Sequence, residues 1–148
     1  MKKNTLILIF LMIVLITGCG NNASNVAPQN IEQDDYLLFV KEKSDIIKNS
    51  LEQDALTQTD MNIKSQELYE LWDDALNYLW GELKSSLSEE EFTKLQAEQR
   101  IWISEKEKII EGAGKEFEGG SIYSLVVNGE AARITEERVY KLYELVKE

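Results

Sequence analysis

The chain offers few side chains that could perform catalysis. Its 148 residues include no histidine and a single cysteine, Cys19. A Ser-His-Asp or Cys-His arrangement and a histidine-ligated zinc site cannot be built from this chain. The sequence also lacks the glycine-rich phosphate-binding loops and the EF-hand pattern. Two carboxylates could in principle cleave a glycosidic bond, but among 27 acidic residues the presence of two is uninformative. We therefore expect a protein that is not an enzyme and that uses no cofactor or metal.

The cysteine ends a segment with the layout of a secretory signal peptide. Lys2 and Lys3 give a positive start, and residues 6–16 form an unbroken apolar run, LILIFLMIVLI. As a helix this run would be about 16 Å long, whereas the hydrocarbon core of a bilayer is about 30 Å thick. The run is too short to span a membrane, and residues 1–18 are predicted to be a signal peptide.

The residues that end at Cys19, I-T-G-C, resemble the lipobox of bacterial lipoproteins. In that family the cysteine thiol receives a diacylglyceryl group and becomes the first residue of the mature chain. The resemblance implies that Cys19 is lipidated and anchors an extracytoplasmic protein to the bacterial membrane, because two or more acyl chains anchor stably. The alternative is a free or buried thiol in an uncleaved helix.

A linker follows the cysteine. Residues 20–30 read GNNASNVAPQN, with the only proline of the chain and almost nothing to bury. We therefore expect residues 19–33 to be the lipidated cysteine and a flexible linker. Residues 34–148 have the size of one domain, and without a disulfide this domain must be held together by its core.

The charge balance restricts the class of partner. The formal net charge is −11, and loss of Lys2 and Lys3 with the signal peptide would make it −13. This argues against nucleic acid, whose binding depends on neutralising phosphates, and against a protein lying flat on an anionic membrane. It suits a cationic protein partner. The alternative is that the charge merely keeps a tethered protein soluble.

The first part of the domain has apolar residues at helical spacing. One such pattern covers about residues 34–56, and a second, stronger one covers residues 68–83. Thr59 or Asp60 is expected to cap the start of the second helix.

The second part of the domain begins with a helix start signal. Ser88, with Glu91 three residues later, forms a capping box for a third helix. Glycines in EGGS (118–121) are expected to end it. A last helical segment runs from residue 122 to the C-terminus, with a break expected at Gly129. We therefore predict an all-α fold, a small antiparallel bundle of three to four helices.

Polar side chains interrupt the apolar stripe of the third helix. Gln99 and Lys106 lie on that stripe beside Trp102. One interpretation is a core edge, where the Lys106 ammonium reaches solvent and Gln99 bonds a neighbouring helix. The other is a polar groove with an aromatic floor.

The second helix carries Asp73 and Asn77 one turn apart, next to Trp80. They belong either to a solvated face or to the same groove. We expect them to pair across helices with a cation, which is Arg100, Lys106 or Arg138.

Four short motifs lie in order along these helices. The first is D-x-x-L-N, formed by Asp73, Leu76 and Asn77, with Trp80 three residues further on. The second is L-x-x-x-Q-x-x-W, formed by Leu95, Gln99 and Trp102, followed by Lys106 and Glu107. The third is G-G-S, formed by Gly119, Gly120 and Ser121, and the fourth is T-x-x-R, formed by Thr135 and Arg138.

Together these motifs resemble the LprI-like lysozyme-inhibitor family of secreted and lipid-anchored bacterial proteins, over about residues 57–148. Three features depart from that family: Trp80 replaces a tyrosine, Lys106 and Glu107 replace Arg-Asp, and paired cysteines found in many members are absent. The lysine departure bears on activity, because lysine cannot reproduce the bidentate pairing of arginine.

The resemblance implies a surface-anchored binding protein that inhibits lysozyme-type muramidases by protein–protein contact. The alternative is an envelope scaffold or sensory module that binds another envelope protein or a glycan. The matched residues also have a structural explanation as turns, caps and interhelical pairs, with Thr135 expected to cap a final helix.

Overall fold

The computed structural model describes residues 32–147. The helices are α1 (Gln33–Gln53), α2 (Gln58–Ser86), α3 (Glu89–Gly114) and α4 (Tyr123–Val146), with a single 3-10 turn, η1 (Lys115–Phe117), after α3. These residues contain no strand, which confirms the predicted all-α fold. The predicted signal peptide, Cys19 and the linker up to residue 31 lie outside the described residues. Within 32–147, no helix combines the length and apolarity needed to cross a membrane.

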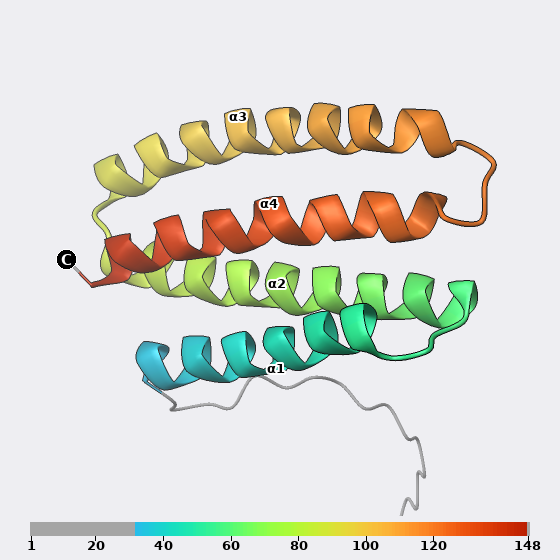
Figure 1. Cartoon of the computed structure of the whole chain (residues 1–148). Coiled ribbons are helices and arrows are strands. Elements are labelled where there is room, and N and C mark those ends of the chain that lie inside the picture. The colour runs from blue at the N-terminus through green and yellow to red at the C-terminus, as the bar shows by residue number, and fades with distance from the viewer. Residues whose placement is uncertain (1–31, 148) are drawn as a thin grey trace, which may run out of the picture.

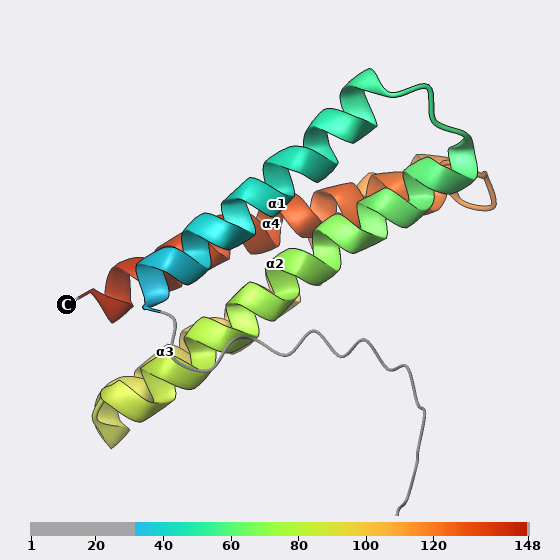
Figure 2. The same ribbon diagram turned by 90° about the horizontal axis from the view of Figure 1, so that it is seen from below.

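The helices lie side by side in the order α3, α4, α2, α1 (Figure 1). Consecutive helices run in opposite directions, which leaves the two middle helices, α2 and α4, running in the same direction. α2 and α4 make the most extensive contact, whereas α1 packs mainly on α2 and α3 mainly on α4. Seen from below, α1 overlaps α4 and α2 overlaps α3 (Figure 2), so the four axes are staggered. α2 and α3 therefore flank α4 and have little backbone contact with each other.

Two capping boxes start α2 and α3. At α3, the Ser88 hydroxyl accepts from the Glu91 amide and the Glu91 carboxylate accepts from the Ser88 amide, as the sequence predicts. α2 begins earlier than expected, because Thr57 is its cap and Asp60 is the partner three residues later. The prediction of Thr59 or Asp60 as the cap is therefore wrong. Thr57 and Asp60 satisfy two backbone donors together, which a cap at either predicted residue would not do.

Two glycines form the turn between α3 and α4. Gly119 has a φ of 74°, a left-handed conformation that glycine adopts without steric cost. The Gly120 amide donates a 2.9 Å hydrogen bond to the Phe117 carbonyl. The glycines thus end the third helical segment, as predicted.

α4 continues from Tyr123 to Val146 without interruption, so the break expected at Gly129 is wrong. A glycine inside a helix costs about 1 kcal/mol relative to alanine. Fully burying a side chain such as Val139 or Leu142 contributes roughly 1.5–3 kcal/mol, and both are fully buried on this helix. Core packing therefore outweighs the local preference.

Trp72 in α2 lies at the centre of the core and has no exposed surface. Its indole Nε1 donates a 3.1 Å hydrogen bond to the Ser44 hydroxyl of α1, and its ring centroid is 5.7 Å from that of Tyr140 in α4. An ion pair of 2.7 Å between Lys48 and Glu136 joins α1 to α4 beside it. α2 is thus covered by α1 and by α4 at once.

α3 is attached less extensively than the other long helices. Its buried residues are Leu95, Gln99 and Gly114. Gly114 lies where α3 approaches the start of α4: a Cβ there would be 2.6 Å from Val127 Cγ1 and 2.8 Å from Tyr123 Cε2. The absence of a side chain at Gly114 therefore sets how closely α3 and α4 approach at this end.

Candidate functional site

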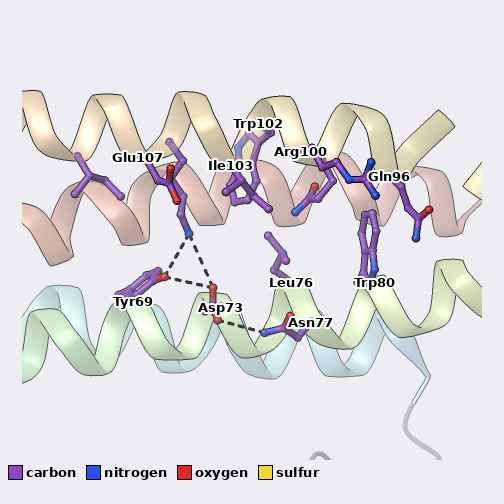
Figure 3. A pocket seen from close by; sticks show the side chains of 13 residues that line it. Tyr69, Asp73, Leu76, Asn77, Trp80, Gln96, Arg100, Trp102, Ile103 and Glu107 are labelled. Carbon is purple, nitrogen blue, oxygen red and sulfur yellow. Dashed lines mark hydrogen bonds and ion pairs between the residues drawn. The ribbon is translucent and has the colours of Figure 1, made fainter. Parts of the chain in front are cut away.

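An open groove of about 630 Å³ lies between α2 and α3. Figure 3 shows side chains of both helices projecting toward each other along it. The α2 side is formed by Tyr69, Asp73, Leu76, Asn77 and Trp80. The α3 side is formed by Gln96, Gln99, Arg100, Trp102, Ile103, Lys106, Glu107 and Ile110. Spacings of three and four residues on each helix place each set along one face, next to the face that packs on α4.

The Lys106 ammonium is the polar centre of the groove. Its side chain is only 12% exposed, and Nζ lies 4.0 Å from Asp73 Oδ1. It donates to the Tyr69 hydroxyl at 3.3 Å and to the Thr135 hydroxyl of α4 at 3.4 Å. The rings of Tyr69 and Trp102 each have their centroid 5.0 Å from Nζ. Two hydroxyls, two aromatic rings and one long ion pair thus hold a mostly buried cation.

The Asp73 carboxylate accepts hydrogen bonds from two neighbours on its own helix. The Asn77 side-chain amide donates to Asp73 Oδ2 at 3.2 Å, and the Tyr69 hydroxyl donates a long 3.5 Å hydrogen bond to Oδ1. Figure 3 shows these interactions along the α2 wall. Asp73 pairs with Lys106, one of the three cations expected from the sequence, and Asn77 bonds Asp73 rather than a cation on another helix.

Arg138 of α4 forms a second polar contact behind the groove. Its Nε donates to Gln99 Oε1 at 2.8 Å, and its guanidinium lies 5.9 Å from the Trp102 ring centroid. Burial lowers the pKa of the Arg138 guanidinium from its ordinary value, and the charge of Glu98 opposes that shift. Gln99 is 7% exposed, so it bonds a neighbouring helix as the core-edge interpretation predicts.

Most of the residues singled out in the sequence come together here. Asp73, Asn77, Gln99, Trp102 and Lys106 line the groove, and the two α4 residues of the T-x-x-R motif bond to its lining. Gly119 and Gly120 lie in the α3–α4 turn and are not among the lining residues.

Thr135 does not cap a helix, so that prediction is wrong. It lies within continuous α4 with no exposed surface, and its hydroxyl accepts from Lys106. Its motif partner Arg138, one turn later, faces Gln99 of α3. The T-x-x-R spacing therefore places two hydrogen-bonding side chains toward α3.

The sequence reasoning did not single out Tyr69, Gln96 or Ile103, which also line the groove. A helical signal for them exists, because Tyr69 lies four residues before Asp73 and Ile103 four residues after Gln99. Trp102 is half-buried and contacts Lys106 and Arg138, whereas Trp72 is the tryptophan of the central core.

The fold and the groove define a small all-helical domain with an amphipathic groove between α2 and α3. Residues 49–142 match the family described as "Lysozyme inhibitor LprI", so the chain belongs to the LprI family. The matched range includes every residue that lines the groove. Comparisons with curated proteins and with solved structures give no match.

Proposed function

We propose that this protein is a surface-anchored inhibitor of lysozyme-type muramidases that acts by protein–protein contact. The observation that carries the proposal is the family match over residues 49–142, which include all of α2 and α3 and most of α4. Inhibition of this kind requires no chemistry from the inhibitor, because it suffices to cover the sugar-binding cleft of the enzyme. The absence of histidine from the sequence is compatible with that role.

The surface charge supports a basic target. The sequence has 27 acidic and 16 basic residues. Within residues 32–147, only six carboxylates take part in ion pairs, those of Asp45, Asp73, Glu90, Glu130, Glu136 and Glu137. Most of the negative charge is therefore available to attract a cationic protein over roughly a Debye length.

The proposed location is the outer side of the bacterial membrane, through lipid on Cys19. The I-T-G-C sequence and the apolar run before it support this part of the proposal. An inhibitor tethered there would stand where an external muramidase approaches the cell wall.

The test is lysis of a peptidoglycan suspension by a basic lysozyme, with and without residues 20–148 as a soluble protein. Between 0.01 and 0.15 M salt the Debye length falls from about 30 to about 8 Å. We expect inhibition at low salt and slower association at high salt, with a smaller change in the off-rate. Each salt concentration needs its own uninhibited control, since lysozyme activity itself depends on salt.

Charge variants make the test specific. Glu52, Glu105 and Glu111 are exposed and do not line the groove. Changing all three to lysine should slow association more than changing all three to glutamine, without altering the urea midpoint greatly. No inhibition at micromolar protein in low salt would contradict the inhibitor proposal. If inhibition changes neither with salt concentration nor in these variants, electrostatic attraction does not explain the binding.

A further inference from the structure

The groove is electrically balanced, unlike the rest of the protein. Its charged lining residues are two acids, Asp73 and Glu107, and two bases, Arg100 and Lys106, so their formal charges sum to zero. The chain as a whole has a formal charge of −11, so the excess negative charge lies outside the groove. A cationic protein surface gains little electrostatic attraction from such a groove.

Hydrogen-bonding groups in the groove are available to a ligand. Within residues 32–147, the side chains of Gln96 and Arg100 make no hydrogen bond or ion pair. Asn77 uses one amide N–H on Asp73, which leaves its carbonyl and second N–H. A side-chain amide both donates and accepts, and this matches the hydroxyl and amide groups of an uncharged polar ligand.

The same groove presents apolar and aromatic surface between these polar groups. The Trp80 ring is half-buried and is supported by Phe92 at a centroid distance of 5.2 Å. Ile103 on the facing helix is 41% exposed. Figure 3 shows Trp80 and Ile103 on opposite walls, with Asn77 between them along the groove and Gln96 beyond Trp80. Ligands with an apolar ring face and a polar rim fit such a mixture.

The groove is elongated. Its α3 wall runs from Gln96 to Ile110, which at 1.5 Å per residue corresponds to about 21 Å. That length accommodates several linked sugar rings but far exceeds a single one. Elongation, balanced charge, free amides and aromatic surface together favour an oligosaccharide over a small ion or a metabolite.

We propose that the groove between α2 and α3 binds an uncharged chain of N-acetylated sugars, with Trp80 as the ring-stacking surface and Asn77, Gln96 and Arg100 as hydrogen-bonding groups. The acetamido group supplies both the methyl that Ile103 contacts and the amide that pairs with the side-chain amides. This assignment goes beyond muramidase inhibition and does not depend on it, because the acidic surface and the groove would recognise different ligands.

The experiment titrates residues 20–148 with the hexamer of N-acetylglucosamine and follows indole and side-chain amide N–H signals by NMR, in the absence of lysozyme. We expect saturable shifts of the Trp80 indole and of the Asn77 and Gln96 amides. The Trp72 indole, bonded to Ser44 in the core, is an internal control and should not move. No saturable shift at millimolar sugar would overturn the proposal.

Variants then locate the site. Trp80→Ala should weaken binding by about tenfold or more, since it removes the large aromatic surface. Gln96→Ala is the second variant, because within residues 32–147 its side chain makes no hydrogen bond or ion pair that the substitution would remove. Ile101→Ala is the matched control: Ile101 is 62% exposed on α3 and does not line the groove. Sugar binding that survives both groove variants, or falls equally in the control, would overturn the assignment.

The two proposals fail separately. If lysozyme shifts these groove signals and the sugar shifts none, the groove is a protein-docking surface and the sugar assignment is wrong. If the sugar binds as described and no muramidase is inhibited, the sugar assignment stands and the inhibitor proposal fails.

Discussion

Replacing Gly114 by alanine should destabilise the protein, whereas the same change at Gly112 should stabilise it. Both glycines lie in the last turns of α3. A Cβ at Gly112 would meet nothing within 4 Å, but at Gly114 it would lie 2.6 Å from Val127 Cγ1 and 2.8 Å from Tyr123 Cε2. The pair therefore separates the helical preference of alanine from the close approach of α3 to α4.

The magnitudes follow from these distances. At Gly112 the helical preference alone should add about 0.5–1 kcal/mol to the free energy of unfolding. At Gly114 the Tyr123 ring is 37% exposed and can swing outward, but the β-branched Val127 side chain has one strongly favoured rotamer in a helix. The backbone must then shift, and overpacking of this kind costs about 1–3 kcal/mol. Subtracting the helical gain leaves a net loss of up to about 2.5 kcal/mol.

Urea melts of residues 20–148 and the two variants, followed by circular dichroism, measure both effects. The slope of unfolding free energy against urea should stay constant, so that midpoint shifts report stability. A Gly114→Ala variant as stable as Gly112→Ala would refute the close packing of α3 against α4 at this end.

Four further outcomes are expected. Cys19→Ala should abolish labelling by a fatty-acid analogue, and label that persists would contradict the lipoprotein proposal. Trp72→Ala should cost about 3–5 kcal/mol in urea melts, and more than truncation of half-buried Trp102. Lys106→Ala should cost about 1–3 kcal/mol, since it removes two ring contacts and a packed stem; an unchanged midpoint would contradict this. Hydrogen bonds from Ser88 lower the pKa of Glu91 from 4.5, so its capping contribution is present above that pH and is lost as the pH falls through the lowered value. The urea midpoint of Glu91→Gln should therefore fall less on acidification than that of the unmodified protein.

Local sequence signals predicted the parts of the fold that local interactions determine. The Ser88–Glu91 capping box and the glycine turn after α3 depend on neighbours in sequence, and both are found. Gly129 shows the limit: a glycine favours a break locally, but the core contacts of α4 keep the helix continuous.

The groove could not be predicted from the pattern of any single helix, because it forms between two helices. Motif spacing placed Asp73 and Lys106 on helical faces, but their pairing requires α2 and α3 to lie on either side of α4. The burial of Trp72 and Trp102 also depends on neighbouring helices. Both residues lie among apolar residues at helical spacing, so the sequence pattern does not show which of them is buried. Trp72 is buried because α2 is covered by two neighbours, whereas the α3 stripe meets mainly α4.

The peripheral position of α3 has a consequence for how the protein opens. Helices α2 and α4 carry most of the buried side chains, while α3 contributes Leu95, Gln99 and Gly114. Segments with fewer buried side chains open locally at a lower free energy than the core does. The amides of α3 should therefore exchange with solvent deuterium through a sub-global opening that leaves α2 and α4 paired. In that partly open form the core between α2 and α4 remains, but the groove between α2 and α3 is lost. A ligand bound in the groove would therefore slow the exchange of the α3 amides more than that of the other helices.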